Sequence, residues 1–164
     1  FNISDVEETG KDFEENAILK AKNAFIKTNI SSVSDDSGLI VPAINNEPGL
    51  YSARYAGLNA TDSDNRNKLI SKLKDNKLES TYAYFFCCIV AVGIKGQNEI
   101  IVCSGKVEGE VRTIERGEKG FGYDPMFYPK GYSESFAELN SLEKNKISHR
   151  GQALKKLMDK LNKT

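Results

Sequence analysis

The chain has little of what several protein classes require. Its 164 residues include one histidine and three cysteines, and its 23 basic residues match 23 acidic ones, so the formal net charge is zero. A chain without excess positive charge lacks the field that holds a nucleic-acid backbone non-specifically. We therefore expect no nucleic-acid partner, although local basic clusters remain open.

The cysteines form a poor disulfide framework. Cys87 and Cys88 are adjacent, Cys103 leaves the number odd, and neither a Cys-x-x-Cys nor a zinc spacing occurs. Reduced thiols in a strand core are the better interpretation and fit a cytoplasmic protein. The single histidine, His149, has no histidine or cysteine partner at zinc spacing, which argues against a zinc site.

Long apolar runs are also missing. The longest, residues 85–92, is far too short to cross a membrane, so we expect no membrane partner. Hydrophobic residues make up 39% and charged residues 28%, as in ordinary globular proteins. The length suggests one domain over residues 1–164, compact or two-lobed.

Helical signals occur in four places. Asp12, with Glu15 three residues on, predicts the start of a helix that ends near Asn29. Thr61 predicts the start of a second helix, which runs to about Asp75. A short helical piece is expected at 141–145 and a C-terminal helix after Ser148. The residues expected to face the core from this last helix are Leu154, Leu157, Met158 and Leu161.

Strand signals lie between the helices. The strongest is residues 81–94, which are so continuously apolar that both faces should be covered. Weaker signals predict a strand or its tail at 1–6, a β-prone run at 30–34 and an apolar run at 39–41. A hairpin connection at 95–98 should lead into a strand at 99–104, followed by a half-exposed antiparallel strand at 106–114.

Two adjacent carboxylates, Asp35 and Asp36, stand between the runs at 30–34 and 39–41. We expect them at a strand end on a turn, where Gly38 lets the backbone bend tightly. Mg²⁺ prefers oxygen ligands and usually takes one or two carboxylates together with substrate phosphates. A solvated turn is the other interpretation, since Asp, Ser and Gly are ordinary turn residues.

A glycine-rich segment at 116–125 is the second candidate. Its backbone N–H groups could converge on a ligand. Phe121 and Tyr123 offer aromatic faces suited to stacking on a base. A glycine-rich hairpin turn with two core aromatics remains the alternative. Further on, His149 and Arg150 in the first turn of a helix are a natural contact for an anion or a nucleobase.

In order along the chain, these stretches resemble the inosine triphosphate pyrophosphatase family, which hydrolyses non-standard purine nucleoside triphosphates such as ITP, dITP and XTP. The resemblance extends from about residue 6 to residue 161. The matching motifs are Glu8-Thr9-Gly10, Phe13-Glu14-Glu15-Asn16-Ala17, Lys20-Ala21, Asp35-Asp36-Ser37-Gly38-Leu39, Pro48-Gly49, Tyr51-Ser52-Ala53-Arg54-Tyr55, Ala83-Tyr84-Phe85-Phe86-Cys87, Gly120-Phe121-Gly122-Tyr123-Asp124-Pro125, Glu143-Lys144 and Ile147-Ser148-His149-Arg150-Gly151.

The resemblance implies an α/β fold, with a long mixed β-sheet in two lobes, flanking helices and a central substrate cleft. It implies a homodimer and a role in cleansing the nucleotide pool. The implied reaction is Mg²⁺-dependent attack of water on the α-phosphorus, which releases the nucleoside monophosphate and pyrophosphate. The family's usual opening strand and loop have no counterpart from Phe1 onward, so the chain looks N-terminally truncated.

The resemblance also implies roles for particular residues. Asp36 matches the catalytic carboxylate, which accepts a proton and binds metal, and Glu8 matches the second acidic residue of the metal site. Lys20 matches a lysine that points at the phosphates. The other positions that match substrate contacts are Ser37, Phe121, Gly122, Tyr123, Asp124, Lys144, His149 and Arg150.

Two alternatives remain open. A related pyrophosphatase could act on standard or modified pyrimidine nucleotides, and a panel of substrates would separate it. A non-catalytic nucleotide- or RNA-binding module could stack bases on its aromatic loop. The paired acids Glu8 and Asp36 argue against this module, because a phosphate-binding surface has no use for them without metal.

Overall fold

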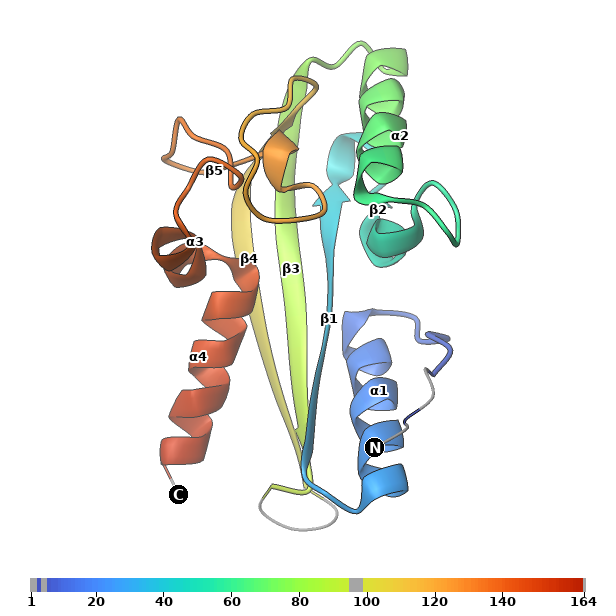
Figure 1. The fold of residues 1–164 in the computed structure, drawn as a ribbon, viewed down its shortest axis with the longest axis vertical. Helices are drawn as coiled ribbons and strands as arrows, with labels where there is room; N and C mark the ends of the chain where they lie inside the picture. Colours follow the sequence, from blue (N-terminus) through green and yellow to red (C-terminus); the bar gives the residue numbers. More distant parts are fainter. Residues whose placement is uncertain (1–2, 4–5, 95–98, 164) are drawn as a thin grey trace. The chain divides into compact units, whose positions relative to one another are not determined.

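The computed structural model describes residues 3, 6–94 and 99–163 and shows an α/β fold (Figure 1). Its sheet has five strands in the order β2-β1-β3-β4-β5. The strands are β1 Ser32–Val41, β2 Glu47–Pro48, β3 Ser80–Val92, β4 Ile100–Arg112 and β5 Phe127–Pro129. The helices are α1 Phe13–Thr28, α2 Asp62–Asp75, α3 Ser141–Ile147 and α4 His149–Asn162, with short 3₁₀ helices at Pro42–Ile44, Gly49–Arg54 and Asp124–Met126.

The two outer pairs of strands are antiparallel. In one, Ile40 lies opposite Pro48, and in the other, Glu110 lies opposite Tyr128. The α/β class with long strands and flanking helices is confirmed. The described residues form an antiparallel sheet, so the parallel pairing that a mixed sheet implies is not found among them.

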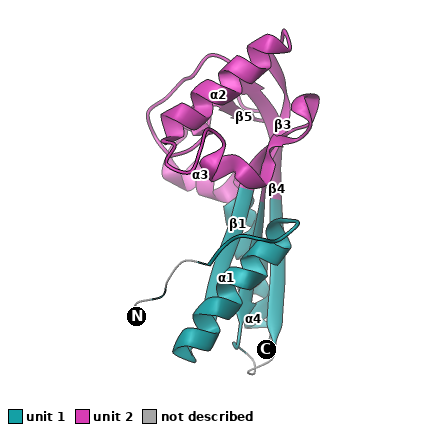
Figure 2. Cartoon of the chain, turned by 90° about the vertical axis from the view of Figure 1, so that its right-hand side faces the viewer, with its two compact units in different colours: residues 1–37, 87–105, 149–164 teal, residues 38–86, 106–148 magenta. Residues whose placement is uncertain are grey.

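The chain divides into two compact units, which Figure 2 colours separately. Unit 1 comprises residues 1–37, 87–105 and 149–164, and unit 2 comprises residues 38–86 and 106–148. The core of unit 1 includes Cys87, Cys103, Ala153 and Leu157. The core of unit 2 centres on three aromatic rings, in which Phe127 lies 4.7 Å from Phe85 and 5.0 Å from Phe136 between centroids. Each unit therefore has a core of its own.

The first two helices begin and end as predicted. The Asp12 side chain accepts a hydrogen bond from the Glu15 backbone N–H at 2.8 Å, and Asn29 ends α1 in the left-handed conformation. Thr61 and Asp64 form a reciprocal capping box at the start of α2. Both helices are fixed by local chemistry, which is why the sequence predicts them well.

Two predicted interruptions of strands are wrong. Asp35, Asp36 and Gly38 all lie within the continuous strand β1, because the polar side chains find partners on both faces of the sheet. The expected strands at 99–104 and 106–114 are one strand, β4, with Gly105 inside it. A Cβ atom on Gly105 would lie 2.0 Å from the carbonyl oxygen of His149. This glycine therefore permits close approach of α4 and does not break the strand.

The predicted inner face of α4 is only partly correct. Leu157 is buried and Leu161 packs against the unit 1 core, but Leu154 and Met158 are each 50% exposed. Ala153 is buried in their place. The buried residues of α4 lie at positions 149, 153 and 157, four residues apart. The buried face of the helix is therefore narrower than the apolar pattern of the sequence predicts.

Some predictions fall on residues that are not described. These are most of the strand expected at 1–6 and the hairpin connection at 95–98. Within the described ranges, no helix is long and apolar enough to span a membrane. The three cysteines are buried and unpaired, as predicted.

Candidate active site

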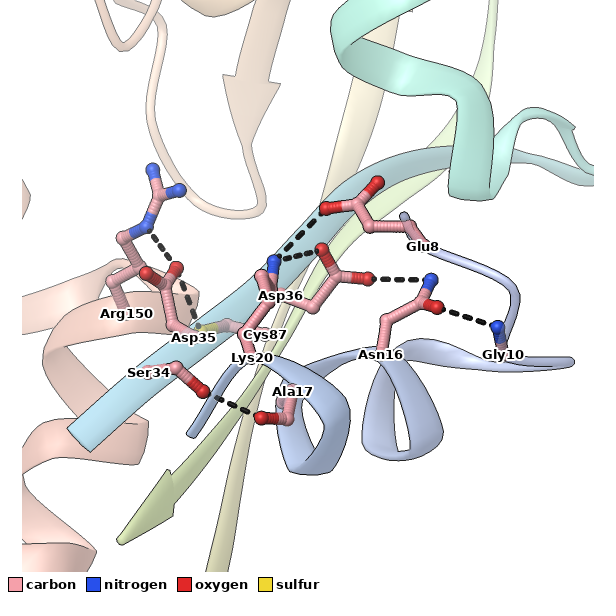
Figure 3. Close-up of polar contacts among 10 residues, drawn as sticks. All are labelled: Glu8, Gly10, Asn16, Ala17, Lys20, Ser34, Asp35, Asp36, Cys87 and Arg150. Carbon is pink, nitrogen blue, oxygen red and sulfur yellow. Dashed lines mark hydrogen bonds and ion pairs between the residues drawn. The ribbon is translucent and has the colours of Figure 1, made fainter. Parts of the chain in front are cut away.

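Strand β1 presents its two adjacent acids to opposite faces of the sheet in unit 1. Side chains alternate along a strand, so Asp36 points toward α1 while Asp35 points toward α4 (Figure 3). The two carboxylates therefore belong to separate clusters. This separation follows from their lying within a strand instead of on a turn.

Asp36 shares a lysine with the second predicted acid. The Lys20 ammonium donates to Asp36 Oδ1 at 2.7 Å and to Glu8 Oε1 at 3.1 Å (Figure 3). Lys20 comes from α1, and Glu8 comes from the segment that precedes it. The structure thus brings together Glu8, Lys20 and Asp36, three of the residues that the resemblance singled out.

A residue that the sequence analysis did not assign to the site holds this cluster together. Asn16 is 1% exposed, and its Nδ2 donates to Asp36 Oδ2 at 3.3 Å. Its Oδ1 accepts from the Gly10 backbone N–H at 2.8 Å. A Cβ atom on Gly10 would lie 2.6 Å from this oxygen, so only glycine fits. Asn16 therefore ties the segment that carries Glu8 to the carboxylate of Asp36. We refer to Glu8, Asn16, Lys20 and Asp36 as the acidic cluster.

Burial and neighbouring charge set the protonation behaviour of the acidic cluster. Burial raises the pKa of Asp36 above its usual value and outweighs the opposing effect of Lys20, and the Glu8 carboxylate raises it further. Burial lowers the pKa of Lys20, but its hydrogen bonds to Asp36 and Glu8 outweigh this and raise it. Lys20 therefore stays cationic, while Asp36 is a better proton acceptor than an exposed aspartate.

The second acid of β1 orients an arginine. Asp35 Oδ2 accepts from Arg150 Nε at 2.8 Å and lies 3.8 Å from the Cys87 sulfur. Burial raises the pKa of the Cys87 thiol to about 12, and the Asp35 charge adds to the effect. Cys87 is therefore a neutral core thiol and not a nucleophile. Arg150 is the predicted substrate contact whose direction Asp35 fixes.

The remaining predicted residues of unit 1 lie close by in the chain. Ser37 follows Asp36 in β1 and is half-buried. His149 is 6% exposed and begins α4. Its backbone carbonyl oxygen lies close to Gly105 of β4. The prediction that His149 and Arg150 lie in the first turn of a helix is confirmed.

In unit 2 the glycine-rich segment is held by a buried carboxylate. Asp124 is 3% exposed, and its Oδ2 accepts from Lys144 Nζ at 2.5 Å and from the Phe121 backbone N–H at 2.8 Å. A Cβ atom on Gly120 would lie 2.1 Å from the same oxygen. We refer to residues 120–124 as the base loop, after the contact with the base that the resemblance implies. Gly120 therefore serves close packing, whereas a Cβ atom on Gly122 would meet nothing within 4 Å. The expected convergence of N–H groups on a ligand is wrong for Phe121, whose N–H is bound to Asp124.

The two aromatic residues of the base loop differ sharply. Phe121 is 59% exposed, and its ring centroid lies 5.0 Å from the Lys144 ammonium. Tyr123 is 4% exposed and donates its hydroxyl hydrogen to the Ser52 carbonyl oxygen at 2.9 Å. The expectation that Tyr123 stacks on a base is therefore wrong, because its ring belongs to the core. For Phe121, whose ring is exposed, stacking on a base stays a prediction.

Some hollows of the described surface lie away from the predicted site residues. One in unit 2, of about 440 Å³, is lined by Tyr82, Tyr128 and Tyr132 with Glu108 and Glu110 among others. Its lining includes none of the predicted site residues.

The acidic cluster fits Mg²⁺ by the type of its donor atoms. Glu8 and Asp36 are hard oxygen donors aimed at one point, as their shared contact with Lys20 shows. Within the described residues no group of three or more His, Cys, Asp or Glu could hold a metal ion. Two carboxylates completed by substrate phosphates are the usual arrangement for Mg²⁺, so the donor set matches that metal.

Comparison with known proteins identifies the family. The model of the Ham1 family matches residues 1–160. The chain belongs to the Ham1 family. A curated relative named dITP/XTP pyrophosphatase, from Bacillus anthracis, is 46% identical over 160 residues, which cover 98% of this chain and 79% of the relative. A relative with the same name from Idiomarina loihiensis is 46% identical over 163 residues, covering 99% and 81%.

A solved structure agrees with this membership. The structure of a HAM1 protein from Coxiella burnetii matches this chain with a TM-score of 0.91 at 43% identity, covering 99% of this chain and 82% of that one. The predicted α/β fold is therefore confirmed for this Ham1-family chain, and the names of the curated relatives agree with the family that the sequence motifs resemble.

Proposed function

We propose that this chain is a nucleoside triphosphate pyrophosphatase that acts on non-standard purine nucleotides such as ITP, dITP and XTP. The observation that carries the proposal is the convergence of Glu8 and Asp36 on Lys20 around a buried, proton-accepting carboxylate. The names of the Bacillus anthracis and Idiomarina loihiensis relatives supply the substrate class.

The chemistry assigned to the acidic cluster is general-base hydrolysis. Asp36 takes a proton from water as the water oxygen bonds to the α-phosphorus. The bond from the α-phosphorus to the bridging oxygen breaks, and pyrophosphate leaves. Lys20 offsets negative charge beside the two carboxylates, and Asn16 orients Asp36. A Mg²⁺ ion held by Glu8 and Asp36 would neutralise charge on the phosphate oxygens.

Recognition of the base is assigned to the base loop and its lysine. The exposed ring of Phe121 can stack on a purine, and the Lys144 ammonium is a donor suited to a 6-keto oxygen. Adenine presents a 6-amino donor at that position, so it would leave the lysine facing another donor. His149 and Arg150 are the further donors proposed to contact substrate, and Ser37 is proposed to assist them.

The setting proposed for this activity is a homodimer in the cytoplasm that cleanses the nucleotide pool. Three reduced, buried cysteines support a reducing compartment. The homodimer rests on the family resemblance.

The test is pyrophosphate release from ITP, dITP, XTP, GTP and ATP, with Mg²⁺ and with a chelator. We expect Mg²⁺-dependent release from ITP, dITP and XTP and far slower release from ATP. Equal release from ATP and ITP would overturn the proposed substrate class. Nucleotide binding that needs no metal and leads to no release would favour a binding module instead.

A further inference from the structure

Two side chains of helix α2 form hydrogen bonds with the backbone N–H and the carbonyl oxygen of one residue in the base loop. The Gly122 N–H donates to Asp62 Oδ2 at 2.7 Å, and the Gly122 carbonyl oxygen accepts from Arg66 Nη1 at 2.9 Å. Asp62 and Arg66 are four residues apart on α2 and therefore share one face of the helix. All three residues belong to unit 2. We refer to this pair of hydrogen bonds as the Gly122 clamp.

Two glycines of the base loop have positive φ angles, and holding them in one conformation calls for a constraint. Gly122 has φ +60° and Gly120 has φ +79°, in a region that glycine enters and leaves at little cost. A loop with two such glycines has several accessible conformations, and holding one of them costs conformational entropy. The Gly122 clamp offsets this cost by fixing the peptide beside Phe121.

Helix α2 is a firm anchor for the clamp. Its first turn is closed by the capping box of Thr61 and Asp64. The buried side chain of Asn65, between Asp62 and Arg66, accepts from the Ala56 backbone N–H at 2.7 Å. Functional geometry is better held by regular elements than by loops. The anchor is therefore stiffer than the loop it holds.

We infer that Asp62 and Arg66 are positioning residues for substrate discrimination: through the Gly122 clamp they fix Phe121 relative to Lys144. Neither residue needs to touch the nucleotide. The inference rests on the proposed function, because it assumes that Phe121 and Lys144 face the base. Misplacement of a recognition group by about 1 Å is enough to cost tenfold or more in selectivity.

The first experiment compares Asp62→Ala with Asp62→Asn. The alanine variant loses the acceptor for the Gly122 N–H, whereas asparagine keeps an acceptor and loses only the charge. We expect Asp62→Ala to lower the ITP-to-ATP ratio of kcat/KM by about tenfold, mainly through KM for ITP. Asp62→Asn should restore most of the ratio. If only the charge at the helix N-terminus mattered, the ITP-to-ATP ratio would fall equally in both variants. That result would overturn the inference.

Two controls separate the clamp from stability and from a second ion pair. Asp75→Ala removes an exposed acid at the far end of the same helix and should leave the ratio unchanged. Arg66 also lies 3.1 Å from Glu115, so Glu115→Ala tests that contact alone. Arg66→Met should lower the ratio, while Glu115→Ala should not. Equal effects of Arg66→Met and Glu115→Ala would remove Arg66 from the clamp.

A substrate-free readout keeps this inference apart from the proposed function. Amide hydrogen exchange of the peptide spanning 120–124 should speed up at least tenfold in Asp62→Ala and stay at the wild-type rate in Asp75→Ala. If the wild type releases no pyrophosphate, the proposed function fails, and the exchange rates still decide whether the clamp exists. Unchanged exchange in Asp62→Ala, or an unchanged ITP-to-ATP ratio in an active enzyme, would overturn the inference.

Discussion

The acidic cluster of unit 1 and the base loop of unit 2 are built on opposite principles. In the acidic cluster, two carboxylates share one ammonium, so negative charge is in excess. Burial raises the pKa of Asp36, and the Glu8 charge adds to the effect. In the base loop, one carboxylate is matched by one ammonium, and the backbone around it is hydrogen-bonded within the protein. A cluster with excess negative charge is suited to catalysis, whereas a loop with paired charges is suited to keeping one backbone conformation.

This difference predicts how each region responds to mutation. Neutralising Asp36 in the acidic cluster should lower turnover with little loss of stability, because burial and the nearby Glu8 carboxylate disfavour its ionised form. Changes in the base loop should cost stability and selectivity together, because the buried charges there are paired.

The largest expected effect is that of Asp36→Asn, which removes the proposed base. Turnover should fall at least about a thousandfold. The folded-state pKa of Asp36 is raised, so its ionised form disfavours folding above that pKa and has no effect well below it. The variant should therefore unfold at the same or a higher temperature at pH 7. Pyrophosphate release and thermal unfolding measure the two effects.

Asp35→Asn is the matched control for this prediction. It changes the neighbouring acid, which faces Arg150 on the other side of β1. Its turnover should fall far less than that of Asp36→Asn. Equal losses in the two variants would contradict the assignment of separate clusters to the two acids.

Lys144→Met should give the largest loss of stability in unit 2. It leaves the Asp124 carboxylate buried without its counter-ion, which costs about 3 kcal/mol. The double variant Lys144→Met/Asp124→Asn removes the stranded charge and should recover part of the loss. Urea unfolding of both variants tests this prediction. A single variant as stable as the wild type would show that the pair is not effectively buried.

Gly105→Ala should disturb unit 1 through packing and not through charge. The added Cβ would meet the His149 carbonyl oxygen at 2.0 Å, so the start of α4 must shift. We expect a loss of about 2 kcal/mol and lower activity, since His149 and Arg150 move with the helix. Ser104→Ala, one residue earlier in β4, is the control and should be nearly neutral. A fully stable Gly105→Ala would refute the close approach.

The smallest expected effect concerns Glu47 in unit 2. A hydrogen bond from the Tyr55 hydroxyl, helped by Lys72, lowers the pKa of Glu47 below its usual value. Its contribution to stability is complete above the unfolded pKa and is lost as pH falls through the lowered folded pKa. Glu47→Gln should therefore cost under about 1 kcal/mol at pH 7 and nothing in strong acid. Denaturant unfolding at a series of pH values checks this; a cost that persists in strong acid would contradict it.

The parts of the fold that follow from local chemistry could be predicted from the sequence. The caps at Asp12 and Thr61 lie within three residues of the groups they bind, so both helix starts were correct. Glycine was ambiguous, because it marks turns as well as close approaches. Gly38 was expected at a turn but lies within β1, and Gly105 lies where α4 approaches β4.

What the sequence could not supply depends on contacts between distant segments. Phe121 and Tyr123 look equivalent in the chain, yet one ring is exposed and the other is in the core. The hydrogen bonds of Asp62 and Arg66 to Gly122 join residues 60 and 56 positions apart in the chain. No local sequence pattern predicts them. Asn16 could have been noticed, since it is a polar residue beside Ala17 on the buried side of α1.

The acidic cluster is proposed to direct water to the α-phosphorus of the nucleotide. Hydrolysis of ITP in ¹⁸O-labelled water, followed by mass spectrometry of both products, tests it most directly. The label is expected to enter inosine monophosphate while pyrophosphate stays unlabelled, and Asp36→Asn should give neither product at a measurable rate. Label in pyrophosphate, or release of inorganic phosphate in place of pyrophosphate, would contradict it.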